Sequence, residues 1–188
     1  MKFNVNSAFT EFKERLNEGS IEIYNEASVQ FELGVIIREL FGMDYALSFE
    51  RNITTLGLNK VEFLKKEMDL YVSSVSGDGR HCIEIKYPTN GQYPEQMYAS
   101  CKDIRFLEQL AACGFAPSYF LFLTSDMNFY NDKEKEGIYR MFRKEKSLHG
   151  MIKKPTGHTS EYIELMNVYK MNWLDLKGKL KYFLISVG

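Results

Sequence analysis

The sequence predicts a single α/β domain in which helices flank a mixed β-sheet, and three observations predict this class. Residues 26–41 carry apolar side chains at helical spacing, which indicates a helix with one face on a core. Residues 67–74 and 80–88 alternate polar and apolar side chains around a Gly-Asp-Gly turn, which is typical of an antiparallel hairpin. The nearly continuous apolar run of 118–126 fits a buried central strand.

The first elements follow from their start and stop signals. Residues 8–18 indicate a short helix that ends at Gly19. Asn25 is a favourable N-cap for the helix at 26–41, because its side chain can accept a hydrogen bond from a free N–H of the first turn. Residues 45–53 then predict a strand, which precedes the hairpin.

A crossover connects the hairpin to the apolar strand. Pro94 can open a helix at about 95–113, because a proline in the first turn loses no helical hydrogen bond, and Gly114 ends it. This helix lies between the second hairpin strand and residues 118–126. We therefore expect a strand–helix–strand unit that places two parallel strands in the sheet.

The segment 126–160 differs in character, since it is polar and rich in Lys and Arg. We interpret it as a basic insertion with a short helix near 133–146. A mobile loop is expected to follow, through Pro155 and Gly157.

The tail, 161–188, predicts strands as a C-terminal β extension, with the last two joined at residues 177–179. The whole chain, 1–188, is expected to form one domain with its core at about 25–125. Apolar residues make up 45% of the sequence, which is enough to bury a sizeable core.

Composition excludes several classes of protein. Three cysteines without metal-ligand spacing argue against a disulfide framework and against a zinc site. The charged N-terminus and the lack of an apolar run near about 18 residues predict neither a signal peptide nor a membrane span, so we expect a cytoplasmic protein. A net charge of −1 disfavours a protein that coats nucleic acid by charge alone, but a metal ion in an acidic site can offset local negative charge.

The chemistry is expected where the hairpin strands meet. Met68, Leu70 and Val72 are predicted to point to one face of the first strand, and Asp69 to the other. Glu84 and Lys86 are two residues apart on the second strand and therefore share a face. Two carboxylates and an ammonium can converge there, and hard oxygen ligands suit Mg²⁺ or Mn²⁺. Charges on a central strand are costly unless they are paired or metal-bound.

Asp69, a gap of 14 residues and then Glu84-Ile85-Lys86 resemble the bipartite motif of the PD-(D/E)xK nuclease superfamily. Met68 stands where that family has its leading proline. The resemblance covers about 25–125 and implies a restriction-endonuclease-like fold. It also implies a metal-dependent endonuclease that hydrolyses phosphodiester bonds, with DNA the expected substrate. It assigns Asp69, Glu84 and the backbone carbonyl of Ile85 as metal ligands, and Lys86 as the catalytic lysine.

Many members of that superfamily add an acidic residue from the first core helix. We prefer Glu32, which borders the apolar stripe, as a catalytic residue that binds a second metal ion or orients the first. Glu26 is a secondary candidate, because it lies in the first helical turn, where a carboxylate can simply offset the helix dipole. From the helix after the motif, Gln96 and Lys102 are further candidates.

Basic residues supply candidates for phosphate contacts: Lys102, Arg140, Arg143, Lys144, Lys153 and Lys154. A charge run of this kind also fits a plain solvated face. Two alternatives to an enzyme stay open on the same fold, a nucleic-acid-binding or a protein-interaction subunit of a restriction or defence system. Duplex cleavage would favour a homodimer by analogy with the fold.

Overall fold

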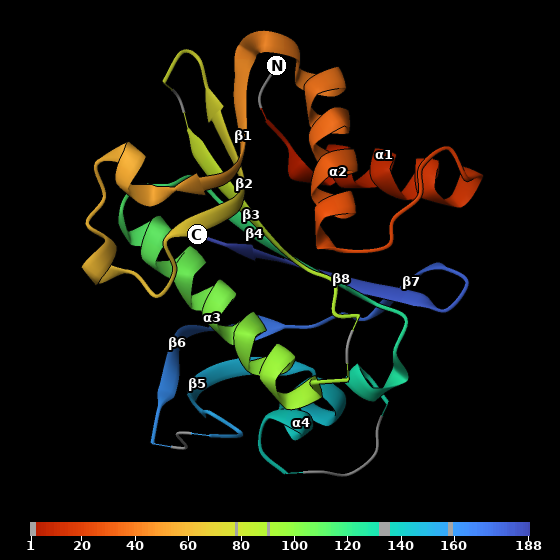
Figure 1. The fold of residues 1–188 in the computed structure, drawn as a ribbon, viewed down its shortest axis with the longest axis vertical. Helices are drawn as coiled ribbons and strands as arrows, with labels where there is room; N and C mark the ends of the chain where they lie inside the picture. Colours follow the sequence, from red (N-terminus) through yellow and green to blue (C-terminus); the bar gives the residue numbers. More distant parts are fainter. Residues whose placement is uncertain (1–2, 78, 90, 132–135, 158–159) are drawn as a thin grey trace.

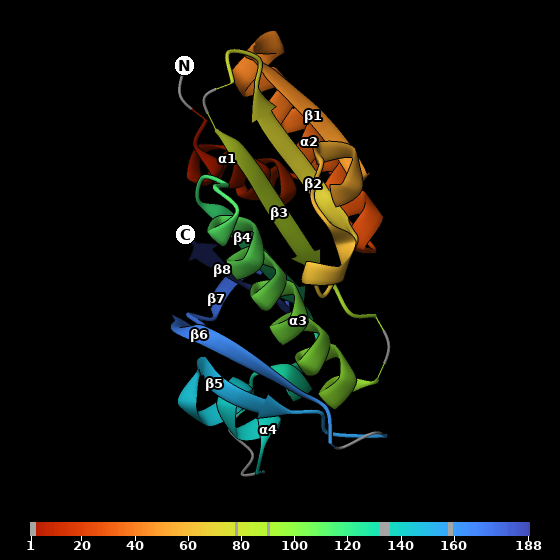
Figure 2. The ribbon, with the colours of Figure 1, turned by 90° about the vertical axis from the view of Figure 1, so that its left-hand side faces the viewer.

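The computed structural model describes residues 3–77, 79–89, 91–131, 136–157 and 160–188. A six-stranded mixed sheet forms the centre of the molecule, in the order β1-β2-β3-β4-β8-β7. Helices α1 and α2 cover one face, while α3 and a separate two-stranded sheet, β5-β6, cover the other (Figures 1 and 2). The α/β class and the flanking helices are therefore confirmed.

The bounds of the elements agree with most of the sequence expectations. The helices are α1 (Val5–Glu18), α2 (Glu26–Phe41), α3 (Tyr93–Ala112) and α4 (Ile138–Arg140). The strands are β1 (Tyr45–Asn52), β2 (Glu67–Ser74), β3 (Arg80–Lys86), β4 (Ser118–Thr124), β5 (Ser147–Lys153), β6 (Tyr162–Lys170), β7 (Leu174–Lys177) and β8 (Leu180–Val187). Short 3-10 turns lie at η1 (Gly42–Asp44), η2 (Ile53–Leu56), η3 (Lys60–Glu62) and η4 (Met127–Phe129), and a π-helical turn at η5 (Met141–Glu145).

Helix α2 begins where the sequence predicts. The Asn25 side chain accepts a hydrogen bond from the N–H of Ser28 at 2.8 Å, and the Ser28 hydroxyl reaches back to the N–H of Asn25. This reciprocal cap satisfies two backbone donors that the helix itself leaves without partners. It holds the first turn of α2, which carries Glu26, in a defined position.

The sheet places the predicted hairpin at its centre. Strands β2 and β3 pair antiparallel from Ser73–Arg80 to Leu70–Ile83, and β3 pairs parallel with β4 through the α3 crossover. Both pairings were predicted, although Asp78 of the hairpin turn lies outside the described residues. The prediction that Met68, Leu70 and Val72 share one face was wrong. Met68 belongs to the core on the α3 side, while Leu70 and Val72 face α1 and α2.

The C-terminal half departs from the prediction. Residues 147–153 were expected to belong to a mobile loop, but they form β5, because Leu148 and Ile152 are buried against the α3 side of the core. The short helix near 133–146 is reduced to α4 and the π-helical turn, with residues 132–135 outside the described part.

The predicted strands of the tail are confirmed, but they do not form one appendage. Only β6 pairs with β5, while β8 pairs antiparallel with β4 along seven residues and β7 completes the sheet edge. The core therefore extends well beyond the predicted range of 25–125.

The central position of β8 has a measurable consequence. Phe183 is fully buried and stacks on Phe122 at 5.2 Å between ring centroids. Phe183→Ala should lower the free energy of unfolding by about 3–5 kcal/mol, because it leaves a cavity in the core. Denaturant unfolding would measure this, with the exposed Ser186 as control, since Ser186→Ala should change stability by less than about 0.5 kcal/mol. A small effect of Phe183→Ala would show that the tail is a dispensable extension.

Candidate functional site

The site lies where β2 and β3 separate. Their ladder ends at the pair Leu70–Ile83, one residue before Asp69 on β2 and Glu84 on β3. Beyond this pair the carboxylate of Asp69 connects the two strands, because its Oδ2 accepts a hydrogen bond from the N–H of Ile85 at 2.7 Å. Asp69 is thereby held beside the Glu84-Ile85-Lys86 segment of β3, as the resemblance implies.

An ammonium group occupies the centre of the site. Lys65 donates a hydrogen bond to Glu84, and its Nζ lies 3.0 Å from Oδ1 of Asp103 and 3.6 Å from Oδ1 of Asp69. The Glu84 side chain is completely buried, and its other oxygen accepts a hydrogen bond from the Cys82 thiol at 3.3 Å. Three carboxylates from β2, β3 and α3 therefore converge on one cation.

Lys86 lies on the outer side of the same cluster. Its Nζ is 3.4 Å from Oδ2 of Asp103 and 3.5 Å from Oε1 of Glu26. The same oxygen of Glu26 also accepts a hydrogen bond from the N–H of Tyr87 at 3.2 Å. Asp103 thus bridges the two lysines, and Glu26 ties the start of α2 to the end of β3.

Burial and excess negative charge perturb the carboxyl groups. Burial raises the pKa of Asp69 to about 6, although Lys65 opposes this rise. Burial raises the pKa of Glu84 well above its ordinary value, the neighbouring Asp69 adds to the rise, and Lys65 again opposes it. Within the cluster, Glu26, Asp69, Glu84 and Asp103 supply four acidic groups against two ammonium groups.

The pKa values of the two lysines are raised, although burial by itself would lower them. Burial alone would lower the pKa of Lys65 and of Lys86, but the surrounding carboxylates outweigh it and raise both pKa values. Both side chains are therefore fixed positive charges at neutral pH, and neither is suited to act as a general base.

The structure brings most of the predicted core of the site together, with one exchange between the two α2 candidates. Asp69, Glu84 and Lys86 share the cluster, and Glu26 contacts Lys86 directly. Glu32 is partly buried elsewhere on α2, and within the described residues no hydrogen bond or ion pair ties it to the cluster. The acidic residue that α2 contributes is therefore Glu26 rather than the preferred Glu32.

Gln96 lies beside the cluster, as the position of the crossover helix predicts. It lines an open pocket of about 270 Å³ together with Glu26 and Tyr87. Glu26 connects this pocket to the cluster, because it lines the pocket and also contacts Lys86.

Two residues of the cluster escaped the sequence prediction. Lys65 lies on the irregular segment before β2, and no pattern there distinguishes it from the exposed Lys66. Asp103 had a usable signal, because it is a charged residue on the buried stripe of α3, three positions after Ser100 and four before Leu107. A buried acid at such a position requires a partner, which the structure supplies in Lys65 and Lys86.

The basic residues expected to contact nucleic acid fall into two groups. Arg143 is buried, donates to the carbonyl of Asn128 and stacks on Tyr139, so its expected role in phosphate binding is corrected to a structural one. The others reach the surface in whole or in part: Lys102 beside the Tyr98 ring, Arg140 paired with Glu145, Lys154 paired with Glu161, and the exposed Lys144 and Lys153.

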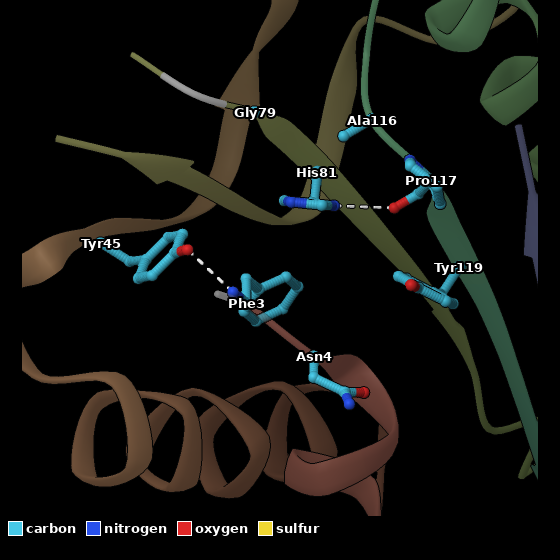
Figure 3. Close-up of a pocket in the computed structure, with 8 residues that line it drawn as sticks. All are labelled: Phe3, Asn4, Tyr45, Gly79, His81, Ala116, Pro117 and Tyr119. Carbon is cyan, nitrogen blue, oxygen red and sulfur yellow. Dashed lines mark hydrogen bonds between the residues drawn. The ribbon is translucent and has the colours of Figure 1, made fainter. Parts of the chain in front are cut away.

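A larger pocket lies away from the cluster, at the other end of β3. It measures about 680 Å³ and is lined largely by rings, including Phe3, Tyr45, His81 and Tyr119 (Figure 3). The Tyr45 hydroxyl accepts a hydrogen bond from the N–H of Phe3 at 2.8 Å. None of the residues predicted to form the catalytic site lines it.

The donor set of the cluster fits the implied metal in its chemistry. Within the described ranges, no group of three or more carboxylate, imidazole or thiol side chains is already gathered as a metal site. The resemblance, however, requires two side chains and one backbone carbonyl. Asp69 and Glu84 already share a cation, and the Ile85 carbonyl is expected to point the same way as its N–H, toward Asp69. These hard oxygens suit Mg²⁺ or Mn²⁺.

No protein-family model matches the chain, and neither a curated protein nor a solved structure matches it. The relation to the PD-(D/E)xK superfamily therefore stays a prediction from the motif. Of the helices in the described ranges, none combines the length and the apolar character that crossing a membrane requires.

The raised pKa of Asp69 predicts how stability depends on pH. Between 3.8 and about 6 the folded protein holds a proton on Asp69 that the unfolded chain releases, so the free energy of unfolding falls as pH rises through this window. Asp69→Asn removes the ionisable group and with it this loss of stability, while the amide oxygen of the asparagine can still accept the hydrogen bond from the N–H of Ile85. Relative to wild type, the variant should gain about 2 kcal/mol between pH 4 and pH 7.5. Urea unfolding in EDTA at both pH values would measure it, and an equal difference at both would contradict the prediction.

Proposed function

We propose that this chain is a metal-dependent nuclease that hydrolyses phosphodiester bonds, with DNA as the expected substrate. The observation that carries the proposal is the convergence of Asp69 and Glu84, from neighbouring strands, on a single cation. Had their carboxylates lain on opposite sides of the sheet, they could not share a metal ion. Mg²⁺ or Mn²⁺ bound there would supply an activated water and polarise a phosphate oxygen.

The charge of the cluster supports a cation site. With both lysines protonated and all four acids ionised, the cluster retains two negative charges in a largely buried position. Such an excess is unfavourable in a buried place; burial first, and the neighbouring carboxylates second, raise the pKa values of Asp69 and Glu84. A divalent cation would offset it, so the site is arranged to gain from binding one.

Lys86 is suited to hold the substrate. Its side chain is 15% exposed, and it lies at the end of β3 beside the pocket lined by Gln96 and Tyr87. The acids around it keep it charged. An ammonium fixed in this way can bind a phosphate oxygen and stabilise the negative charge that develops during phosphodiester hydrolysis.

One observation favours the non-catalytic alternative, in which the same fold binds nucleic acid or a protein partner of a defence system. Lys65 already neutralises Glu84 directly, so the buried carboxylate has a partner without any metal. In that case the cluster would be a structural ion-pair network. DNA binding that persists in EDTA and survives Asp69→Asn would select this alternative.

Substitutions in the cluster test the enzymatic proposal. With Mg²⁺ or Mn²⁺, the purified protein should cleave DNA, and EDTA should abolish cleavage. Lys86→Ala and Glu84→Gln should each lower the cleavage rate by about 100-fold or more, because each removes a charge that the reaction requires. Gel-based cleavage of plasmid and linear DNA would measure the rates.

The matched control is Lys66→Ala, since Lys66 is exposed and adjacent to Lys65 in sequence, and this variant should cleave like wild type. Parallel reactions with RNA would show whether RNA, rather than DNA, is the substrate. Wild-type protein that cleaves neither polymer with either metal, or a Lys86→Ala variant as active as wild type, would sink the proposal.

A further inference from the structure

The ammonium of Lys65 lies between Asp69 and Glu84, where the motif would place a metal ion. Its ammonium contacts Asp69 and Glu84, the two carboxylates that the motif assigns to the metal, and its backbone belongs to the irregular segment before β2. A lysine ammonium and a divalent cation cannot occupy the same position between these oxygens. Metal binding therefore requires Lys65 to move.

Asp103 offers the displaced ammonium another partner. Oδ1 of Asp103 is 3.0 Å from Nζ of Lys65, and Asp103 is 5% exposed. Its Oδ2 is buried with no hydrogen-bond donor within the described residues, although Lys86 lies 3.4 Å away. An ammonium that leaves Glu84 can therefore remain on Asp103 and complete the partners of this carboxylate.

The charge of the whole cluster agrees with such a shift. One divalent cation added to four carboxylates and two ammonium groups makes the cluster neutral, provided that Lys65 stays within it. Full expulsion of Lys65 would leave one uncompensated negative charge beside the buried Glu84. The arrangement thus favours transfer of Lys65 over its release.

The transfer requires movement of a side chain alone. The Lys65 side chain is 25% exposed and has a flexible four-carbon stem. Its segment is fastened to α3, because Gln109 accepts from the N–H of Leu64 at 3.0 Å and donates to the carbonyl of Glu62 at 2.7 Å. The backbone can therefore stay in place while Nζ moves from Glu84 to Asp103.

We infer that Lys65 is the built-in counter-ion of the metal site: its ammonium holds the place of the divalent cation between Asp69 and Glu84, and metal binding shifts it from these two carboxylates onto Asp103 alone, which it already contacts. There it remains as a second positive charge beside Lys86. The inference rests on the metal site of the proposed function, but not on cleavage. In the metal-free protein Lys65 keeps the buried carboxylates paired, and it makes metal binding weaker than the same ligands would otherwise allow.

Mn²⁺ binding to the full chain tests this directly. Lys65→Met keeps the stem and removes the competing charge, so isothermal titration calorimetry should show Mn²⁺ bound about tenfold more tightly, or better, than by wild type. Mn²⁺ should also raise the Tm of Lys65→Met by more than that of wild type. The matched control, Lys66→Met, should bind Mn²⁺ as wild type does. Equal or weaker binding by Lys65→Met would overturn the inference.

Lys65→Met leaves buried carboxylates without their partner and can lower stability. Should the variant be unfolded without metal, Mn²⁺ titrated into it should restore its circular dichroism. Metal-free buffer and Lys66→Met serve as controls. Failure of Mn²⁺ to fold it would count against Lys65 as the counterpart of a metal ion.

The role of Asp103 has its own test. Asp103→Asn should weaken Mn²⁺ binding in the wild-type background, because displaced Lys65 loses its partner, and should weaken it less in the Lys65→Met background. Equal effects in both backgrounds would overturn the transfer to Asp103.

The outcomes separate this inference from the proposed function. Tight Mn²⁺ binding by Lys65→Met without cleavage by any variant would overturn the nuclease proposal and support the counter-ion. Mg²⁺-dependent cleavage by wild type with unchanged Mn²⁺ affinity in Lys65→Met would overturn the counter-ion and support the nuclease.

Discussion

The pairing of Glu84 with Lys65 is the interaction on which the site depends. Glu84 lies in β3, between β2 and β4, and its side chain is completely buried. A carboxylate in such a place costs several kcal/mol unless it is neutralised or paired. The surrounding structure supplies the pairing: Gln109 fastens the segment that carries Lys65 to α3, and Asp103 on the same helix holds the ammonium from the other side. Helix α3 is therefore part of the site as well as its cover.

The separation of β2 from β3 determines how Asp69 is held beside Glu84. Because the ladder ends at Leu70–Ile83, the N–H of Ile85 is free to bind a side chain, and Asp69 takes it. A continued ladder in this register would also place Asp69 opposite Glu84, but it would use the N–H of Ile85 for strand pairing. The local loss of strand pairing thus lets the Asp69 carboxylate bind that N–H and lie fixed beside Glu84.

The metal-binding and the structural interpretations of the cluster differ in how they account for its excess of acidic over basic side chains, four against two. Structural ion-pair networks usually approach neutrality when they are buried, since uncompensated charge is costly. This cluster instead keeps more acids than bases and raises the pKa of Asp69 to about 6, because the carboxylate is buried. Perturbed groups of this kind occur at functional sites and also in structural ion-pair networks, so the excess of acids, rather than the pKa, distinguishes the two interpretations. The excess is therefore the property that connects the fold to the proposed chemistry.

The sequence by itself determined the helix at 26–41 with its Asn25 cap, the hairpin, the crossover and the grouping of Asp69, Glu84 and Lys86, because helical and strand periodicity and cap chemistry are local properties of the chain. Only the tertiary structure decided that β8 lies beside β4, that Arg143 is buried, and that Glu26 rather than Glu32 contacts Lys86. It also brought together Lys65 and Asp103, 38 positions apart, so that the Lys65 ammonium contacts both Asp103 and the buried Glu84. Such long-range charge pairing depends on where elements pack, and no local spacing encodes it.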